Sequence, residues 1–546
     1  MKLSGAQIVL EVLKEQGVDT VFGYPGATNL NIFDELYKYG DTFKHILTAH
    51  EQGAAHAADG YARATGKVGV CFATSGPGST NLVTGIATAY MDSVPVVAIT
   101  CNVANGLIGR DTFQEIDITG ITMPITKHNF LVKEIENLAS SIRRAFKIAM
   151  SGRKGPVLVD IPKDVTSAYY DYYPEEAQLP EPSPTTSEKA LKRAAELLQK
   201  AEKPLIYAGG GCILSDVGDD LITFAEKLDA PVASTLMGLG AFPYNHPLHL
   251  GLIGMHGHFE CNRAAHDCDV LITCGARFSD RVAINRNRFA PNAEIIHIDI
   301  DAAELDKNIN SNYHIVGDLK EVIPLLTREI EQLDHSAWKA EIEKSRKSFV
   351  QDDNEGFVNP QMLIEKVDSL TADDAIVVTD VGQHQLWTAQ FYKFLKPRTF
   401  LTSGGLGTMG YSMGAAIGAK LGKPESQVVM FAGDGGFHMN LSELVTMASY
   451  NIPVKMFIMN NSVLGMVRQW QMFFCDGRYA DTVPGRKTDF VKVAEAFGIK
   501  GLRINDGSEI DSVVEEAFAV EGPVLVDCSI SPDANVLPMI APEEAY

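Results

Sequence analysis

The sequence lacks closely spaced cysteines. Its 546 residues include eight cysteines, at positions 71, 101, 212, 261, 268, 274, 475 and 528. None of them forms a Cys-x-x-Cys pair, and the nearest group, Cys261, Cys268 and Cys274, lacks the tight spacing of a zinc site. In a chain of this length the pattern predicts buried thiols in a reducing compartment.

Positive charge is also scarce. Lys and Arg together number 47, against 69 Asp and Glu, which leaves a net charge of −22. Such an excess of negative charge argues against nucleic acid and anionic membrane surfaces as partners. We interpret it as a solvated acidic surface and expect a cytoplasmic protein.

Long apolar runs are missing as well. No stretch approaches the roughly 20 apolar residues of a membrane-spanning helix. The first 14 residues predict an amphipathic helix with charges inside it, and not a signal or transit peptide. We therefore expect no membrane partner and a first domain that begins at once.

Short apolar runs alternate with helical patterns along the whole chain. This alternation is typical of an α/β fold whose parallel sheets carry helices on both faces, and 546 residues correspond to about three domains. We predict three doubly wound domains with mainly parallel sheets, at residues 1–168, 188–345 and 356–546. A segment rich in Pro, Glu, Ser and Thr (169–187) forms the first linker, and a charged helix and linker (338–355) form the second.

One hexapeptide occurs twice. Gly-Pro-Val-Leu-Val-Asp stands at 155–160 and again at 522–527, near the ends of the first and third predicted domains. We interpret the repeat as a sign that these two domains fold alike, although Gly-Pro before a buried strand is also common by chance.

The most informative motif lies in the third domain. Gly433-Asp434-Gly435 follows the apolar run 427–432, and Asn460-Asn461 follows the apolar run 455–459. Both motifs are expected at the carboxyl ends of buried parallel strands, where open α/β sheets bind ligands. Asp and Asn oxygens suit Mg²⁺, and the glycines let the backbone approach a diphosphate. The spacing resembles the thiamine-diphosphate motif, whereas Asp-Gly alone would be an ordinary turn.

Glu51 is the second candidate. It precedes a small-residue helix over 52–63, where an isolated Glu would be interpreted as a first-turn carboxylate favoured by the helix dipole. Beside a thiamine-diphosphate motif, Glu51 resembles the glutamate that such enzymes hold against the cofactor's aminopyrimidine ring. A carboxyl group in an apolar pocket can exchange a proton with that ring, which leads to deprotonation of the thiazolium C2.

The chain as a whole resembles the catalytic subunit of acetohydroxyacid synthase, or acetolactate synthase, a thiamine-diphosphate enzyme of branched-chain amino-acid synthesis. The resemblance runs nearly end to end, and its most discriminating segment is 461–470. The other segments that carry it are 22–26, the Glu51 segment, 73–78, 111–115, 157–164, 236–242, 254–257, 275–278, 380–385 and 403–410.

The resemblance implies roles at the thiamine-diphosphate site. The Mg²⁺ ligands would be Asp434, Asn461 and the backbone carbonyl of Val463. The diphosphate would be held by Gly382, Gln383 and His384, next to Gly433 and Gly435. Met409 would prop the cofactor into a bent shape, and Glu51 would be the activating acid and base.

It also implies roles around the substrates. The reaction centre would be lined by Phe113, Gln114 and Lys163. The pocket of the second 2-keto acid would be shaped by Arg281 and Trp470, with Val467 and the cofactor contact Met466 also there. Arg281 is a candidate clamp for a carboxylate. The alternative for the methionine and the tryptophan is ordinary core packing.

The middle domain resembles the family's FAD domain, in which the flavin is structural. The matching residues are Arg153, Gly209, Gly210, His256, Arg277, Asp299 and Asp318. A glycine run after a strand is weak support by itself, so the other matches carry the FAD prediction.

The chain departs from the family pattern at several positions. They include Ala27, Thr28, Cys101, Asn102 and Ile284. We expect Ala27, Thr28 and Asn102 near the reaction centre or the acceptor side, where they bear on acceptor preference, and Ile284 near the flavin.

The implied reaction decarboxylates pyruvate and joins the resulting hydroxyethyl carbanion to a second pyruvate, giving 2-acetolactate, or to 2-ketobutyrate, giving 2-aceto-2-hydroxybutyrate. Alternatives are a flavin-dependent pyruvate oxidase, a 2-keto acid decarboxylase and a non-catalytic paralogue. The segment 111–115 and Trp470 favour the synthase, and the intact Glu51, Asp434 and Asn461 argue against the paralogue. The resemblance further implies a homodimer or tetramer, with Glu51 and the diphosphate site from different subunits, and a small regulatory subunit as a partner.

Overall fold

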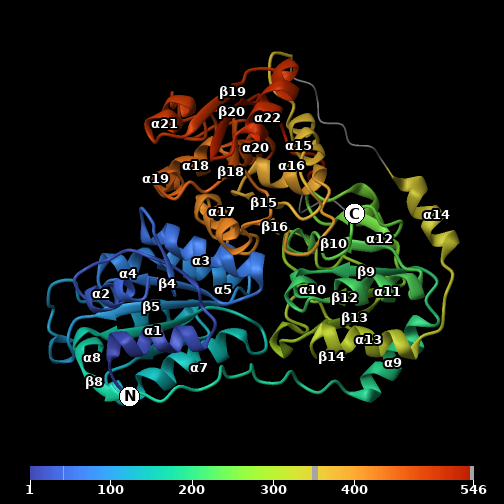
Figure 1. Ribbon diagram of the computed structural model, residues 1–546. Coiled ribbons are helices and arrows are strands. Elements are labelled where there is room, and N and C mark those ends of the chain that lie inside the picture. The colour runs from blue at the N-terminus through green and yellow to red at the C-terminus, as the bar shows by residue number, and fades with distance from the viewer. Residues whose placement is uncertain (41, 347–354, 541–546) are drawn as a thin grey trace.

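The computed structural model describes residues 1–40, 42–346 and 355–540, which form three six-stranded sheets. Every strand pairing within these sheets is parallel. Figure 1 shows the sheets in an N-terminal domain (blue), a central domain (green) and a C-terminal domain (orange and red). The predicted α/β fold with three domains is confirmed, while the domain boundaries stay predictions. Residues 541–546 of the third domain lie outside the described residues.

The N-terminal domain has the strand order β3-β2-β4-β5-β7-β6. Its central strands are buried on both faces, which explains why they read as continuous apolar runs. The strands are β2 (Thr20–Gly23), β3 (Lys44–Leu47), β4 (Gly69–Ala73), β5 (Val96–Asn102), β6 (His128–Leu131) and β7 (Val157–Pro162). The helices are α1 (Gly5–Glu15), α2 (Leu30–Lys38), α3 (Glu51–Thr65), α4 (Pro77–Asn81), α5 (Val83–Met91), α6 (Ile118–Thr122), α7 (Leu138–Met150) and α8 (Lys163–Ser167).

The first helix starts later than the sequence predicted. Residues 2–4 form a strand, β1 (Lys2–Ser4), which pairs antiparallel with β8 (Tyr169–Asp171). Ser4 then forms a capping box with Gln7, because each side chain accepts a hydrogen bond from the other's backbone N–H. These two bonds satisfy N–H groups that a helix start leaves free, and they fix the start of α1 at Gly5.

The C-terminal domain repeats this topology. Its strand order is β16-β15-β17-β18-β20-β19, so both sheets read 2-1-3-4-6-5 when strands are counted along the chain. The repeated hexapeptide leads into β7 and β20, which hold the same place in the two sheets, and the prediction that these domains fold alike is confirmed. The strands are β15 (Ile376–Thr379), β16 (Phe400–Leu401), β17 (Val428–Gly433), β18 (Val454–Asn460), β19 (Lys500–Ile504) and β20 (Val524–Ser529). The helices are α15 (Pro360–Ser369), α16 (Gln383–Phe391), α17 (Tyr411–Gly422), α18 (Asp434–Asn440), α19 (Leu444–Ser449), α20 (Gly465–Phe474), α21 (Phe490–Ala496) and α22 (Ile510–Ala519).

The central domain has a different order, β11-β10-β9-β12-β13-β14. Counted along the chain it reads 3-2-1-4-5-6, the order associated with dinucleotide binding. The strands are β9 (Pro204–Ala208), β10 (Val232–Ser234), β11 (His249–Leu252), β12 (Val270–Cys274), β13 (Glu294–Asp299) and β14 (Tyr313–Val316). The helices are α9 (Glu188–Leu198), α10 (Gly210–Leu214), α11 (Gly218–Leu228), α12 (Phe259–Asp267), α13 (Leu319–Glu329) and α14 (Ser336–Ser345).

The predicted linkers differ in what the structure describes of them. Residues 172–187 contain no helix or strand and run along the base of the molecule from β8 to α9 (Figure 1). The charged helix expected around Trp338 is α14, but Trp338 itself is buried and its Nε1 donates to the carbonyl of Pro204 at 3.1 Å. Residues 347–354 of the second linker lie outside the described residues.

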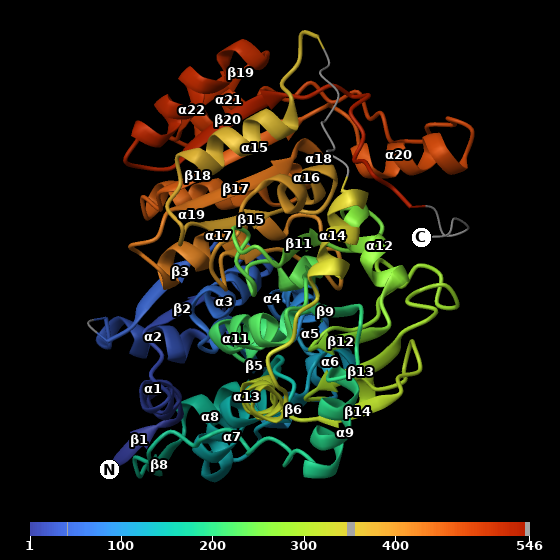
Figure 2. The ribbon, with the colours of Figure 1, turned by 90° about the vertical axis from the view of Figure 1, so that its right-hand side faces the viewer.

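Two helices from opposite ends of the chain join the N-terminal and C-terminal domains. Helices α3 and α17 lie side by side in both Figure 1 and Figure 2. A Cβ atom added to Gly60 would stand 2.2 Å from the carbonyl oxygen of Ala415, and one added to Gly418 would stand 1.8 Å from that of Ala57. The two backbones are therefore in direct contact, and only glycine fits at these positions.

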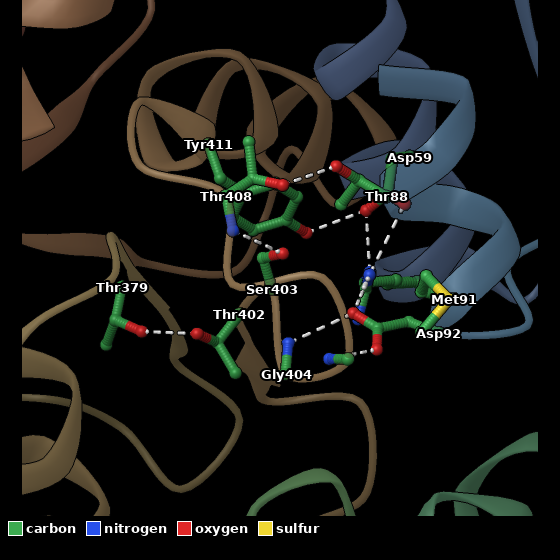
Figure 3. A network of polar contacts seen from close by, with 12 residues as sticks. Asp59, Thr88, Met91, Asp92, Thr379, Thr402, Ser403, Gly404, Thr408 and Tyr411 are labelled. Carbon is green, nitrogen blue, oxygen red and sulfur yellow. Dashed lines mark hydrogen bonds and ion pairs between the residues drawn. The ribbon is translucent and has the colours of Figure 1, made fainter. Parts of the chain in front are cut away.

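A buried polar network lies beside this contact (Figure 3). Arg63 on α3 pairs with Asp59 at 2.6 Å and with Asp92 at 2.9 Å, and both carboxylates are completely buried. Asp59 also accepts a hydrogen bond from the Tyr411 hydroxyl at 2.7 Å. Asp92 accepts from the backbone N–H groups of Gly404 (3.1 Å) and Gly405 (2.7 Å), which lie in the loop before α17. Since a buried charge without its partner is costly, the network ties this loop firmly to the N-terminal domain.

The prediction that the thiols are buried is confirmed for seven of the eight cysteines. All eight cysteines are free, and only Cys475 is partly exposed. Within residues 1–40, 42–346 and 355–540, no helix combines the length and the apolar character that crossing a membrane would need.

The contact between α3 and α17 generates a stability prediction. Gly418→Ala places a methyl group against the Ala57 carbonyl, so the helices must separate, which costs about 1–3 kcal/mol. Gly507→Ala is the matched control, because a Cβ there meets no atom within 4 Å. In thermal unfolding, Gly418→Ala should lower the midpoint by several degrees while the control leaves it unchanged. Equal midpoints for the two variants would show that the helix contact is loose.

Candidate cofactor and active site

Three segments meet at the carboxyl edge of the C-terminal sheet. Residues 380–384 follow β15, Asp434 follows β17, and Asn461 follows β18. These strands are neighbours in the order β15-β17-β18 and run parallel, so their carboxyl ends lie together. The strand order changes direction between β15 and β17, the kind of crevice in which open α/β sheets bind ligands.

Buried polar atoms at this edge are left without partners. Asp434 is 3% exposed, and its Oδ1 has no hydrogen-bond partner among the described residues. The Nε2 of His384 is also buried and unpartnered within that part of the chain. Burial raises the pKa of Asp434 to about 6 and lowers the pKa of His384 to about 4. Unsatisfied buried groups are costly, so a cation beside Asp434 and a polar group beside His384 fit this edge.

The glycines and amides around these atoms are held in place. A Cβ on Gly433 would stand 3.0 Å from Nδ1 of His384, and Gly382 faces the same ring. Gln383 accepts at 3.1 Å from the side-chain amide of Asn461, which orients that amide, and itself donates to the carbonyl of Ala534 at 2.8 Å.

The rest of the predicted metal set offers neutral oxygens. Val463 is buried, and its backbone N–H donates to Oδ1 of Asn461 at 3.3 Å. The described residues hold no group of three or more His, Cys, Asp or Glu side chains that could bind a metal. The chemistry here is therefore one carboxylate with amide and carbonyl oxygens, a set of hard ligands that suits Mg²⁺ together with phosphate.

The loop before α17 brings Met409 to the same place. The next residue, Gly410, donates its backbone N–H to both carboxylate oxygens of Asp380, at 2.9 and 3.0 Å. The methyl carbon of Met409 would lie 3.6 Å from a Cβ on Gly435, and Leu464 would lie 2.7 Å from it. A side chain at position 435 would therefore displace the end of the Leu464 side chain and contact Met409.

The predicted reaction-centre residues lie on the N-terminal domain. Glu51 is the first residue of α3, is half-buried, and accepts from the side-chain amide of Asn81 at 2.9 Å. Gln114 has a positive φ of 61° and lies against Gly76. Phe113 is 85% exposed, and Lys163, at the start of α8, is exposed as well. The carboxyl edge that carries Asp434 belongs to the other domain.

A cavity of about 1000 Å³ lies where the three domains meet. Six of the seven predicted FAD residues line it, namely Arg153, Gly210, His256, Arg277, Asp299 and Asp318. Gly209 does not line it but directly precedes α10. Three of the predicted substrate-side residues line it too, Arg281, Met466 and Trp470, whereas Val467 is 52% exposed and does not.

The walls of this cavity suit a dinucleotide. It opens beside the ends of β9 and β12, where the 3-2-1-4-5-6 order changes direction. Arg153 and Arg277 supply positive charge, and Arg277 also donates to the carbonyl of Met91 at 2.8 Å. Burial raises the pKa of Asp299 to about 6.

The glycines after β9 also have a second use. A Cβ on Gly209 would stand 2.3 Å from the carbonyl oxygen of Gly275, and one on Gly211 would stand 2.7 Å from its Cα. Close packing of two loops therefore requires these glycines whether or not a phosphate lies beside them, and the glycine run alone does not establish a nucleotide site.

Arg281 and Trp470 come together across two domains. The guanidinium carbon of Arg281 lies 5.5 Å from the centre of the Trp470 ring, within cation–π range. The Arg281 side chain is 61% exposed, and its guanidinium lies 3.7 Å from a carboxylate oxygen of the exposed Asp280. Trp470 lies on α20, which follows Asn461 in the sequence, and its ring contacts that of Phe474.

Two of the departures from the family pattern, Thr28 and Asn102, make hydrogen bonds within the N-terminal domain. The hydroxyl of Thr28 lies 2.9 Å from the carbonyl of Cys101, and Asn102 donates to the buried Asp160 at 2.7 Å. Ala27 is exposed. Ile284 is half-buried and does not line the cavity.

Sequence reasoning gave no role to two buried carboxylates. Asp380 is fully buried and accepts hydrogen bonds from Gly410 and Ser412, and Glu443 is fully buried between domains. Asp380 had a signal, since it directly follows a buried strand just as Asp434 does. Glu443 had none, because the backbone groups that it binds, those of Ala49 and His50, are almost 400 residues away in the sequence.

Comparison with known proteins covers all three domains. Family models match three segments: "Thiamine pyrophosphate enzyme, N-terminal TPP binding domain" over residues 3–121, the "central domain" of that family over 191–326, and its "C-terminal TPP binding domain" over 380–528.

Curated relatives match nearly the full chain. A probable acetolactate synthase large subunit of Methanocaldococcus jannaschii is 47% identical over 99% of this chain and 94% of its own length. The acetolactate synthase large subunit of Haemophilus influenzae is 45% identical over 98% and 96%. An acetolactate synthase of Mycobacterium bovis is 46% identical over 99% and 90%. These relatives do not favour the pyruvate oxidase or decarboxylase alternatives. The chain belongs to the acetolactate synthase family of thiamine pyrophosphate enzymes.

Proposed function

We propose that this chain is the catalytic subunit of an acetolactate synthase, which condenses two pyruvates to 2-acetolactate with loss of CO₂, or pyruvate and 2-ketobutyrate to 2-aceto-2-hydroxybutyrate. The observation that carries the proposal is the meeting of His384, Asp434 and Asn461 at three adjacent strand ends, where Asp434 Oδ1 and His384 Nε2 are buried without partners in the described chain. The family membership supports the same reading.

The proposed cofactor is thiamine diphosphate with Mg²⁺. When bound, thiamine diphosphate would supply a nucleophilic carbon for the keto group and an electron sink for the decarboxylation. Asp434, Asn461 and the carbonyl of Val463 would hold the metal. The diphosphate would be held by Gly382, Gln383 and His384, next to Gly433 and Gly435. Met409 lies in the loop whose next residue, Gly410, donates to Asp380. The Met409 side chain would limit the space for the cofactor at the carboxyl edge of the C-terminal sheet.

The activating group would be Glu51, whose carboxyl group could exchange a proton with the pyrimidine ring of a bound cofactor. Phe113, Gln114 and Lys163 line the reaction centre with it. The position of Glu51 on a domain other than that of Asp434, and the exposure of Phe113 and Lys163, support a site completed between two copies of the chain. We therefore propose a homodimer or a tetramer as the active form.

Arg281 and Trp470 receive the second 2-keto acid, with Val467 and Met466 nearby. The exposed guanidinium can bind the acceptor's carboxylate, and the indole offers an apolar face to its alkyl chain. FAD is the proposed occupant of the large cavity and contributes no redox step. Its contacts are Arg153, Gly209, Gly210, His256, Arg277, Asp299 and Asp318. Because two of the relatives above are named large subunits, we further propose a small regulatory subunit as a partner. We propose that this chain is located in the cytoplasm.

Product analysis tests the function directly. The purified protein with thiamine diphosphate, Mg²⁺ and FAD should convert pyruvate to 2-acetolactate without consuming O₂, since the second keto acid, and not oxygen, accepts the two-carbon unit. With added 2-ketobutyrate, 2-aceto-2-hydroxybutyrate should appear as well. Formation of acetate or acetyl phosphate with O₂ uptake, or of free acetaldehyde alone, would overturn the proposal.

Removal of the metal-binding carboxylate should weaken the cofactor. Asp434→Ala leaves the diphosphate charge without its cation, so thiamine-diphosphate affinity at fixed Mg²⁺ should fall at least about tenfold. Asp476→Ala is the control, because that side chain is 88% exposed. Fluorescence titration measures both affinities, and equal values would remove Asp434 from the metal site.

Trp470 should set the choice of acceptor. One methylene in an apolar pocket is worth about 10- to 200-fold in selectivity, so Trp470→Leu should lower the share of 2-aceto-2-hydroxybutyrate when both keto acids compete. Phe473→Leu, a half-exposed neighbour on α20 that does not line the cavity, is the control. If the product ratio of Trp470→Leu stays at the wild-type value, Trp470 does not select the acceptor and its indole serves only in packing.

A further inference from the structure

A single buried carboxylate reaches from the C-terminal domain to the backbone that precedes Glu51. Glu443 is fully buried at the end of the 3₁₀ turn Leu441–Glu443. Its two carboxylate oxygens accept one hydrogen bond each from the backbone N–H groups of Ala49 and His50, both at 3.1 Å. The Thr446 hydroxyl donates a third bond at 2.7 Å.

These bonds fix the first turn of α3. His50 is the N-cap of the helix and its side chain accepts from the N–H of Gln52 at 3.1 Å, so the backbone clamped by Glu443 leads directly into Glu51. Gly53, in the first turn of α3, also packs directly against Glu443, because a Cβ on Gly53 would stand 2.0 Å from a carboxylate oxygen of Glu443.

The segment that ends in Glu443 begins at the carboxyl edge of the C-terminal sheet, with the proposed metal ligand Asp434. Within it, Asn440 donates to the carbonyl of Gly410 at 2.6 Å, beside Met409. Gly410 in turn donates to Asp380. The ten residues of α18 and the following 3₁₀ turn therefore contain the proposed metal ligand and contact both the Met409 loop and the backbone before Glu51.

We propose that Glu443 is a positioning residue for Glu51: its bidentate hold on the backbone of Ala49 and His50 sets the direction of the Glu51 carboxylate. The inference rests on the proposed role of Glu51. If Glu51 serves the cofactor bound by a second copy, Glu443 in one copy orients the activator of the other copy's site.

Exchange of the cofactor's C2 proton is the measurement, because it reports activation before any substrate binds. Glu443→Gln keeps the shape but turns an NH₂ group toward a backbone N–H, so the clamp is half lost. Exchange should slow about 10- to 100-fold, the scale on which small misplacements act, while thiamine-diphosphate affinity by fluorescence titration stays within about threefold of wild type. Glu425→Gln, exposed on the surface, is the matched control.

A double-mutant comparison separates positioning from an independent effect. Glu51→Gln alone should slow exchange strongly, and adding Glu443→Gln to it should cause no further loss, because a positioning residue acts only through the group it positions. A multiplied loss in the double variant would overturn the proposal, as would normal exchange in Glu443→Gln. Normal exchange in Glu51→Gln would instead refute the proposed role of Glu51.

A milder variant covers the case in which Glu443→Gln does not fold. Thr446→Val removes only the hydroxyl bond to Glu443 and should slow exchange a few-fold with unchanged cofactor affinity. Loss of affinity together with the thermal midpoint, with exchange normal in the fraction that binds cofactor, would assign Glu443 a purely structural role and overturn the proposal.

Discussion

The direct backbone contact between α3 and α17 is the constraint on which the rest of the structure depends. Gly60 and Gly418 let the two helices touch, and a side chain at either place would push the N-terminal and C-terminal domains apart. The buried pairs of Arg63 with Asp59 and Asp92 lie beside the contact and hold the loop that leads to Met409 (Figure 3). Because α3 starts with Glu51, one interface places both the proposed activator and the proposed cofactor support.

The repeated topology explains why chemistry gathers at two sheet edges. Both outer domains read 2-1-3-4-6-5, so each offers a crevice at the carboxyl ends of its strands. In the C-terminal domain this edge carries glycines, one carboxylate and amides. In the N-terminal domain, Glu51 follows the edge strand β3, which pairs with β2. The central domain, with its 3-2-1-4-5-6 order, contributes most of the walls of the large cavity.

Much of the fold and part of the site could be predicted from the sequence. Buried parallel strands read as apolar runs, and their carboxyl ends must meet, so Asp434 and Asn461 come together as expected. The place of Asp380 after a buried strand was a signal, but its partner Gly410 was not visible in the sequence. The role of Glu443 could not be predicted at all, because its contact with His50 is set by tertiary packing. Trp338 reads as part of a charged segment yet is buried, since α14 folds back on the central sheet. The sequence suggests Gly209 as a phosphate contact, but the structure requires a glycine there because a side chain would collide with the backbone of Gly275.

We propose that the active site combines Glu51 of one copy with Asp434 of another. Mixing two inactive variants, Glu51→Gln and Asp434→Ala, after dissociation and reassembly tests it most directly. A mixed dimer would then contain one site with both changes and one with neither, so acetolactate formation should return to about a quarter of the wild-type rate at equal mixing. If each site were built from one chain, every mixed site would keep one lesion. Activity that stays at the level of the separate variants, with exchange of subunits verified, would contradict the account.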